Sequence, residues 1–273
     1  MSRLWLAALA VVGMNLSFII PDGGASLTQE ARWHEARRSL AEGNAAAASS
    51  AFEELLEKYP TEPDLHLFLA ISQLRLRNPD GAVVAIRKAL ELDPNHVEAL
   101  TLLGWYELDV RGNIDAAIQQ YTKVVELKPD SPQAHVNLGV AHKNKGQLDK
   151  ALASYNRALE QRPEYVEALS NRGWVFVEQE RWKEARRDFD QALKMKPEDQ
   201  GALQGLAQVL EKTRDYSGAQ EVLRRLNEQS PNFVYWLQWG RIGLIRYWWV
   251  LLLLTLALFA KGRFMRARTQ ANG

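Results

Sequence analysis

The sequence predicts an all-α protein, an α-solenoid of six helix-turn-helix repeats with a signal segment before it and a transmembrane helix after it. Three observations predict this architecture. Prolines recur at intervals of 34 or 35 residues between Pro60 and Pro231. Small and apolar residues between these prolines follow helical spacing. An uncharged apolar run lies near each end of the chain.

The stretch from Pro132 to Pro163 contains one complete repeat. Its apolar positions predict two helices, and the residues NKGQLD between them predict a turn. Gly139 and Ala151 are small where two helices must approach closely, and Tyr155 is large enough to fill the space between them.

The second helix of every repeat carries the same series of a small, a bulky and a small or aliphatic residue. The series are Ala48, Phe52, Leu55; Ala82, Ile86, Ala89; Ala117, Tyr121, Val124; Ala151, Tyr155, Ala158; Ala185, Phe189, Ala192; and Ala219, Leu223, Leu226. This pattern resembles the tetratricopeptide repeat family, whose period is about 34 residues. The resemblance implies a repeat domain over residues 26–233, with repeats at about 29–62, 63–96, 97–131, 132–165, 166–199 and 200–233. The third repeat has one extra residue near Val110, which we expect the turn to absorb.

Composition limits the classes of partner. Residues 26–240 hold 27 Lys and Arg against 32 Asp and Glu, whereas the chain beyond them has six basic residues and no acidic residue. A mildly acidic repeat domain argues against nucleic acid as a partner. The chain has no cysteine, which excludes disulfides and thiolate metal sites.

Residues 1–25 have the layout of an export signal. Arg3 precedes the uncharged run Leu4–Ile20, and Pro21 and a stretch of small residues follow it. This is typical of a signal peptide cleaved after Ala25. The alternative is an uncleaved signal anchor, because 17 residues lie at the lower end of the roughly 17–25 that span a bilayer.

A second apolar segment follows the repeats. We divide it into an aromatic connector at 234–241, which covers the end of the repeats or lies at a membrane surface, and a transmembrane helix at 242–260. That helix would be about 28 Å long, close to the roughly 30 Å of a bilayer core. Its expected anchor residues are Arg246, Tyr247, Trp248 and Trp249.

The tail, 261–273, is basic, and the positive-inside rule predicts that it is cytoplasmic. The repeats would then lie outside, in the periplasm of a bacterium, on its inner membrane. The alternative is a tail-anchored receptor or co-chaperone on an organelle membrane, with its repeats in the cytosol.

We expect no catalysis, cofactor or metal. The sequence has no phosphate-binding glycine loop, metal-spaced histidine cluster or nucleophile elbow. His135 and His142 share a helix face, but two ligands are too few for a catalytic metal.

The resemblance instead implies a peptide-binding groove lined by the first helix of each repeat. The positions that match the family's groove include Trp105, Val136, Asn137, Val140, Asn171 and Trp174. Asn137 and Asn171 are equivalent residues of adjacent repeats and resemble the asparagine ladder of family members that hold extended peptides. The alternative for these residues is packing between repeats. The family's carboxylate clamp is missing, because its Lys and Asn positions hold valines in the fourth repeat and Ser170 and Trp174 in the fifth.

The sequence therefore predicts a non-catalytic, membrane-anchored scaffold that binds a protein partner, as an extended peptide segment, during assembly or maturation of an envelope complex. The alternatives are the cytosol-facing receptor and a self-associating structural protein. The oligomeric state and the identity of the partner stay open.

Overall fold

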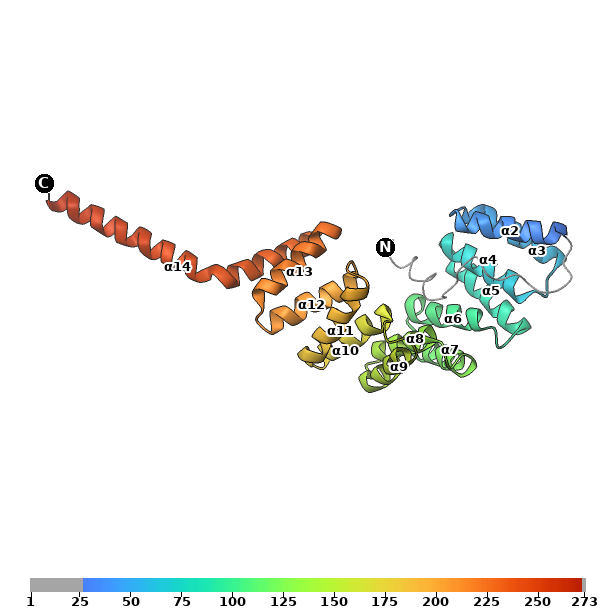
Figure 1. Ribbon diagram of the computed structural model, residues 1–273. Coiled ribbons are helices and arrows are strands. Elements are labelled where there is room, and N and C mark those ends of the chain that lie inside the picture. Colours follow the sequence, from blue (N-terminus) through green and yellow to red (C-terminus); the bar gives the residue numbers. More distant parts are fainter. Residues whose placement is uncertain (1–26, 272–273) are drawn as a thin grey trace. The chain divides into compact units, whose positions relative to one another are not determined.

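The computed structural model describes residues 27–271, and the predicted signal segment at 1–25 lies outside the described residues. Every regular element in the described part of the chain is a helix (Figure 1). The chain divides after Pro163 into two compact units. The prediction of an all-α repeat fold is confirmed.

Within the described residues, the N-terminal unit holds four helix pairs, and the C-terminal unit holds two pairs and a long final helix. In the N-terminal unit the elements are α2 Leu27–Ala41, α3 Ala45–Lys58, α4 Pro63–Arg75, α5 Pro79–Leu92, α6 Val97–Trp105, η1 Tyr106–Val110, α7 Ile114–Leu127, α8 Pro132–Asn144 and α9 Leu148–Gln161. In the C-terminal unit they are α10 Val166–Glu178, α11 Trp182–Met195, α12 Gln200–Lys212, α13 Tyr216–Gln229 and α14 Phe233–Ala271.

The two helices of a repeat approach closely at a glycine of the first helix, as the sequence predicted for Gly139. A Cβ at Gly139 would lie 2.5 Å from Cε1 of Tyr155, and one at Gly173 would lie 2.6 Å from Cε1 of Phe189. Both distances are too short for a real contact, so an aromatic ring occupies the space of the missing side chain. The predicted close approach is confirmed.

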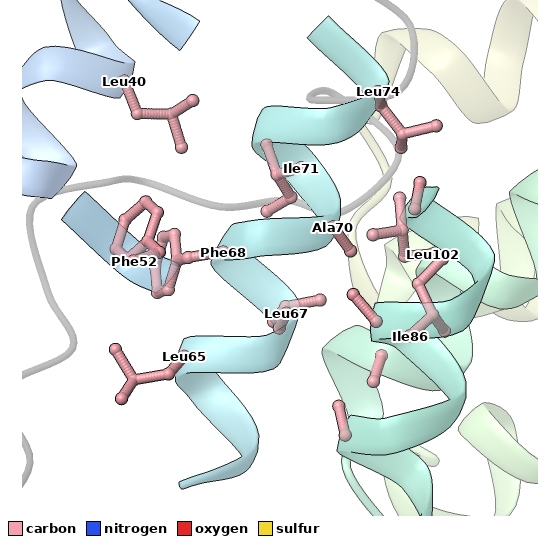
Figure 2. Packing of buried hydrophobic residues seen from close by; sticks show 14 of the residues in the cluster. Leu40, Phe52, Leu65, Leu67, Phe68, Ala70, Ile71, Leu74, Ile86 and Leu102 are labelled. Carbon is pink, nitrogen blue, oxygen red and sulfur yellow. The ribbon is translucent and has the colours of Figure 1, made fainter. Parts of the chain in front are cut away.

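Helix α4 forms the centre of the core in the first three repeats (Figure 2). Phe68 points toward Phe52 of α3, and the two rings stack with centroids 5.6 Å apart. Leu67 and Ala70 point the other way, toward Ile86 of α5 and Leu102 of α6. Complete burial of a Leu or Phe side chain stabilises the fold by about 1.5–3 kcal/mol, so these stacked helices hold one another in place.

Left-handed residues shape the turn inside each repeat. The turn residue has a positive φ at Gly43, Arg77, Gly112, Gly146, Glu180 and Arg214. Side-chain caps begin several second helices, because Asn44, Asn78 and Asn113 each accept a hydrogen bond from the third helical backbone N–H. These contacts satisfy backbone groups that the helix ends leave without intrahelical partners.

The extra residue of the third repeat lies in a π-helical turn, Tyr106–Val110, that continues α6. The Asn113 N–H bonds the carbonyl of Glu107, six residues earlier, whereas the Asn78 N–H bonds that of Gln73, five residues earlier. The prediction placed the extra residue in the turn itself. The structure places it in the last turn of the first helix, before the loop. A widened helical turn keeps backbone hydrogen bonds that a longer loop would lose.

Helix α14 joins the segments that the sequence divided into a connector, a span and a tail. It begins at Phe233, directly after the last repeat, and continues to Ala271. Its first part packs against α13, and the rest extends beyond the repeats (Figure 1).

Candidate functional site

The first turns of α14 are fixed to the last repeat by one apolar and three polar contacts. Ile242 is completely buried. The Tyr235 hydroxyl and the Gln204 amide of α12 are hydrogen-bonded. Arg241 forms an ion pair with Glu211 of α12, and Arg246 Nη1 donates to Gln220 Oε1 of α13 over 3.2 Å. This part of α14 therefore takes the place that the first helix of a further repeat would occupy.

This packing leaves a groove of about 420 Å³ within the C-terminal unit. The groove lies between α12 and α14, and α10 contributes Trp174 to its wall. Its lining residues are Trp174, Gln204, Ala207, Gln208, Glu211, Lys212, Leu223, Leu226, Tyr235, Gln238 and Arg241.

The groove combines an apolar floor with amide walls. Leu223 and Leu226 of α13 are 3% and 0% exposed and form the floor. Gln208 of α12 and Gln238 of α14 are exposed. A glutamine amide both donates and accepts hydrogen bonds, so the walls can pair with the N–H and C=O groups of a peptide backbone.

Trp174, a predicted groove residue, is half-buried and lines this groove. Its Nε1–H donates to the carbonyl of Gly201 over 3.2 Å, and its ring meets that of Phe189 edge to face at 5.8 Å. The hydrogen bond and the ring contact fix the orientation of the indole, while its half-exposed state leaves part of the side chain accessible.

The two asparagines of the predicted ladder differ in exposure. Asn137 of α8 is buried, and its Oδ1 accepts a hydrogen bond from Gln133 of the same helix over 2.9 Å. Asn171 of α10 is half-buried, and its Nδ2 donates to the carbonyl of Glu167 over 2.8 Å. Each amide thus bonds its own helix, and peptide binding by this pair stays a prediction.

The other predicted groove residues lie in or against the core of the N-terminal unit. Trp105 is 5% exposed and belongs to the apolar cluster of the first three repeats. Val136 is 3% exposed, and the partly buried Val140 packs against the cluster that contains Tyr121. These positions match the packing alternative more closely than open groove walls.

The predicted aromatic anchor residues lie just before the middle of α14. Tyr247, Trp248 and Trp249 are 46%, 61% and 51% exposed. Within the described residues, no unbroken helix combines the length and apolarity of a membrane span. The segments Phe233–Val250 and Leu252–Leu258, bent by 43°, meet both criteria only as a pair.

His135 and His142, the two histidines on one helix face, each form a hydrogen bond with another group of the protein. His135 Nε2 lies 2.8 Å from the carbonyl oxygen of Pro129, and His142 Nδ1 lies 2.8 Å from Oε1 of Gln147. Among the described residues, no group of three or more metal-ligating side chains comes together.

Sequence reasoning missed the glutamines of the groove, Gln204, Gln208 and Gln238. Glutamine is common on exposed helix surfaces, so its presence alone is no signal. The useful signal was the long segment after Pro231. It follows the second helix of the last repeat directly, as the first helix of a new repeat would.

Comparisons with known proteins agree with the repeat pattern. Two tetratricopeptide repeat models match the chain, one over residues 39–106 and 176–238 and the other over 130–198. A third model, described as TPR repeat, matches residues 111–146. No curated protein sequence gives a significant match to the chain.

Several solved structures share the fold. PilF of Pseudomonas aeruginosa is 18% identical with a TM-score of 0.68, and the match covers 78% of this chain and 96% of PilF. PilW, described as a widely conserved type IV pilus biogenesis factor, is 18% identical with a TM-score of 0.69, covering 77% of this chain and 97% of PilW. YrrB, described as a TPR protein with an unusual peptide-binding site, is 20% identical with a TM-score of 0.54, covering 71% of this chain and all of YrrB.

The family models together extend over most of the chain, and the helix pairs, the glycine–aromatic contacts and the period of about 34 residues agree with them. The chain belongs to the tetratricopeptide repeat family.

Proposed function

We propose that this protein is a non-catalytic, membrane-anchored scaffold that binds an extended segment of a partner protein in the groove between α12 and α14. The observation that carries this proposal is the groove itself, in which exposed amides flank a buried leucine floor. Its volume of about 420 Å³ is in the range of ordinary ligand pockets, about 300–1,000 Å³.

The lining favours a peptide over a small charged ligand. Of the three charged lining residues, Arg241 and Glu211 are paired with each other and Lys212 remains, so the groove offers no concentrated charge. Gln208 and Gln238 stand on opposite helices and can each bond a peptide group, while an apolar side chain of the peptide fills the space above Leu223 and Leu226. Trp174 adds a rigid aromatic contact of the kind that often anchors interfaces.

The place of action in this proposal is the bacterial envelope. The basic tail after residue 260 and the export signal at 1–25 favour repeats in the periplasm and a tail in the cytoplasm. The likeness in fold to a pilus biogenesis factor suggests assembly or maturation of an envelope complex as the process. A reporter that is active only in the periplasm, inserted near Gly201, should be active; an inactive reporter would refute this topology.

The groove is tested with a library of random twelve-residue peptides selected against the full chain in detergent micelles. The best peptide is then titrated by calorimetry. The variant with Gln208→Ala and Gln238→Ala should bind it about 5- to 150-fold more weakly, because two amide hydrogen bonds contribute roughly 0.5–1.5 kcal/mol each.

The matched control is Gln229→Ala, which removes an exposed glutamine of α13 outside the groove. It should bind the selected peptide as the unchanged chain does. Equal affinity of all three proteins would place peptide binding elsewhere and contradict the proposed site.

A further inference from the structure

A stripe of exposed aromatic and aliphatic side chains runs along the outer face of the first half of α14. Phe233, Leu237, Leu244 and Trp248 are spaced four, seven and four residues apart, which places them on one helix face. They are 70%, 47%, 63% and 61% exposed. Trp236, which is 57% exposed, stacks on Phe233 with ring centroids 6.0 Å apart.

The opposite face of the same helix makes the contacts with the repeats. Ile242 is buried there, and Tyr235, seven residues earlier, bonds Gln204. Arg246, on this face, is held by Gln220, whereas Arg241 lies beside the stripe, four residues after Leu237, and is held by Glu211. Both basic side chains of Phe233–Val250 are therefore held by the repeats, and the one beside the stripe, Arg241, is paired with a carboxylate.

The stripe extends over about four turns of the helix. From residue 233 to 248 it extends about 24 Å along the helix. Exposed apolar surfaces of this size mark sites of association with proteins or membranes. The composition distinguishes the two, because tryptophan and tyrosine with aliphatic residues are typical of the boundary between lipid headgroups and acyl chains.

The continuation of the helix supplies a second argument. After Val250 the described residues Leu252–Leu258 are apolar apart from Thr255 and exposed, and they are bent by 43° from Phe233–Val250. A helix that lies in the plane of a membrane surface must bend to send its next segment toward the bilayer interior.

We infer that the first half of α14 lies in the headgroup layer of the membrane, with the stripe Phe233–Leu237–Leu244–Trp248 facing the lipid. The last repeat is then held directly against the bilayer surface, because Ile242 and three polar contacts fix it to this helix. The inference rests on the proposed membrane anchor and extends the lipid-binding surface from residues 242–260 back to Phe233.

The test uses the full chain in vesicles of phosphatidylethanolamine and phosphatidylglycerol. Because the chain has no cysteine, one introduced cysteine carries one fluorophore. The labelled positions are Leu237→Cys and Leu244→Cys on the stripe, Gln238→Cys in the groove as the matched neighbour, and Leu254→Cys in the apolar half. Lipids that carry a nitroxide at the headgroup or deep in the acyl chain quench a fluorophore that contacts the membrane at that depth. Iodide quenches a fluorophore that is exposed to water.

The expected result is headgroup-nitroxide quenching at positions 237 and 244, with iodide quenching severalfold weaker than at 238. Equal iodide quenching at 237, 244 and 238, with deep quenching at 254, would overturn the inference and leave the anchor intact. No lipid quenching at 254 would refute the anchor itself. Protection of 237 from iodide without lipid quenching, together with disulfide-linked dimers of the Leu237→Cys chain, would assign the stripe to a second copy and overturn the inference.

Discussion

Arg172 of α10 and Asp188 of α11 form a two-point ion pair inside the fifth repeat. Arg172 Nε lies 2.6 Å from Oδ2 of Asp188, and Nη2 lies 2.8 Å from Oδ1. Asp188 is 1% exposed. The second repeat has Leu69 and Ala85 at these two positions, so an ion pair replaces an apolar contact.

Asp188→Ala should lower the free energy of unfolding by roughly 3–5 kcal/mol, because it removes the carboxylate that compensates a guanidinium in a water-poor site. The measurement is urea unfolding of the full chain in detergent micelles, followed by circular dichroism. The double variant Arg172→Leu with Asp188→Ala restores the residues of the second repeat and should recover most of the loss. If it is as unstable as the single variant, the ion pair is not the cause.

A second prediction concerns pH. His96 Nε2 lies 2.9 Å from Oδ1 of Asp64, and its Nδ1 lies 3.4 Å from Oε2 of Glu98. Burial lowers the pKa of His96, but hydrogen bonds to Asp64 and Glu98 and their charges outweigh burial and raise this pKa from 6.5 to about 9. The hydrogen bond from His96 lowers the pKa of Glu98.

Because the folded chain holds this proton more tightly than the unfolded chain, the stabilisation is complete below pH 6.5 and disappears as pH rises through about 9. The free energy of unfolding should therefore fall over this interval. His96→Gln keeps a side chain that can form hydrogen bonds but does not titrate, so its unfolding should lack this part of the slope. Identical pH profiles of the two proteins would contradict the assignment.

A third prediction concerns the left-handed turn residues. Arg77 and Arg214 have φ values of 60° and 64°, a conformation that is strained for residues with a Cβ. Arg77→Gly or Arg214→Gly should raise the free energy of unfolding by about 0.5–1 kcal/mol. Gly146 has φ of 76°, and the reverse change, Gly146→Ala, should lower the free energy of unfolding. Thermal melting of the three variants checks both directions.

A fourth prediction concerns the contact of Gly139 with Tyr155. Gly139→Ala places a methyl group 2.5 Å from the Tyr155 ring and should cost roughly 1–3 kcal/mol through overpacking. The second repeat combines Ala70 with Ile86 at these positions. Adding Tyr155→Ile to Gly139→Ala should therefore restore part of the stability, as measured by urea unfolding. No recovery would mean that the ring is not the obstacle.

The sequence predicts the repeat fold well because its signals are local and repeated. Closing prolines, small residues and bulky residues recur at one interval, and each helix pair packs through the same positions, such as Gly139 with Tyr155. Because the pattern occurs six times, the repeat fold is still recognised where one repeat departs from it, as at the ion pair of Arg172.

The candidate site was less predictable because it depends on where the repeats stop. Trp174 was predicted and lines the groove, whereas Trp105, at the equivalent position, lies in the apolar core. The difference arises from the neighbouring helices, which a position within a repeat does not specify. The groove walls of Gln208 and Gln238 form only because α14 packs where another repeat would begin.

The widened turn at Tyr106–Val110 has a consequence for how such chains change length. One inserted amino acid is taken up there, and the next helix still places Ala117, Tyr121 and Val124 in the core at the usual spacing. A single-residue insertion at the end of a repeat's first helix is therefore a tolerated edit. The same insertion between Ala117 and Val124 would rotate part of the packing face away from its partners by about 100°. Tolerance of single-residue insertions therefore varies along the chain with the period of the repeats.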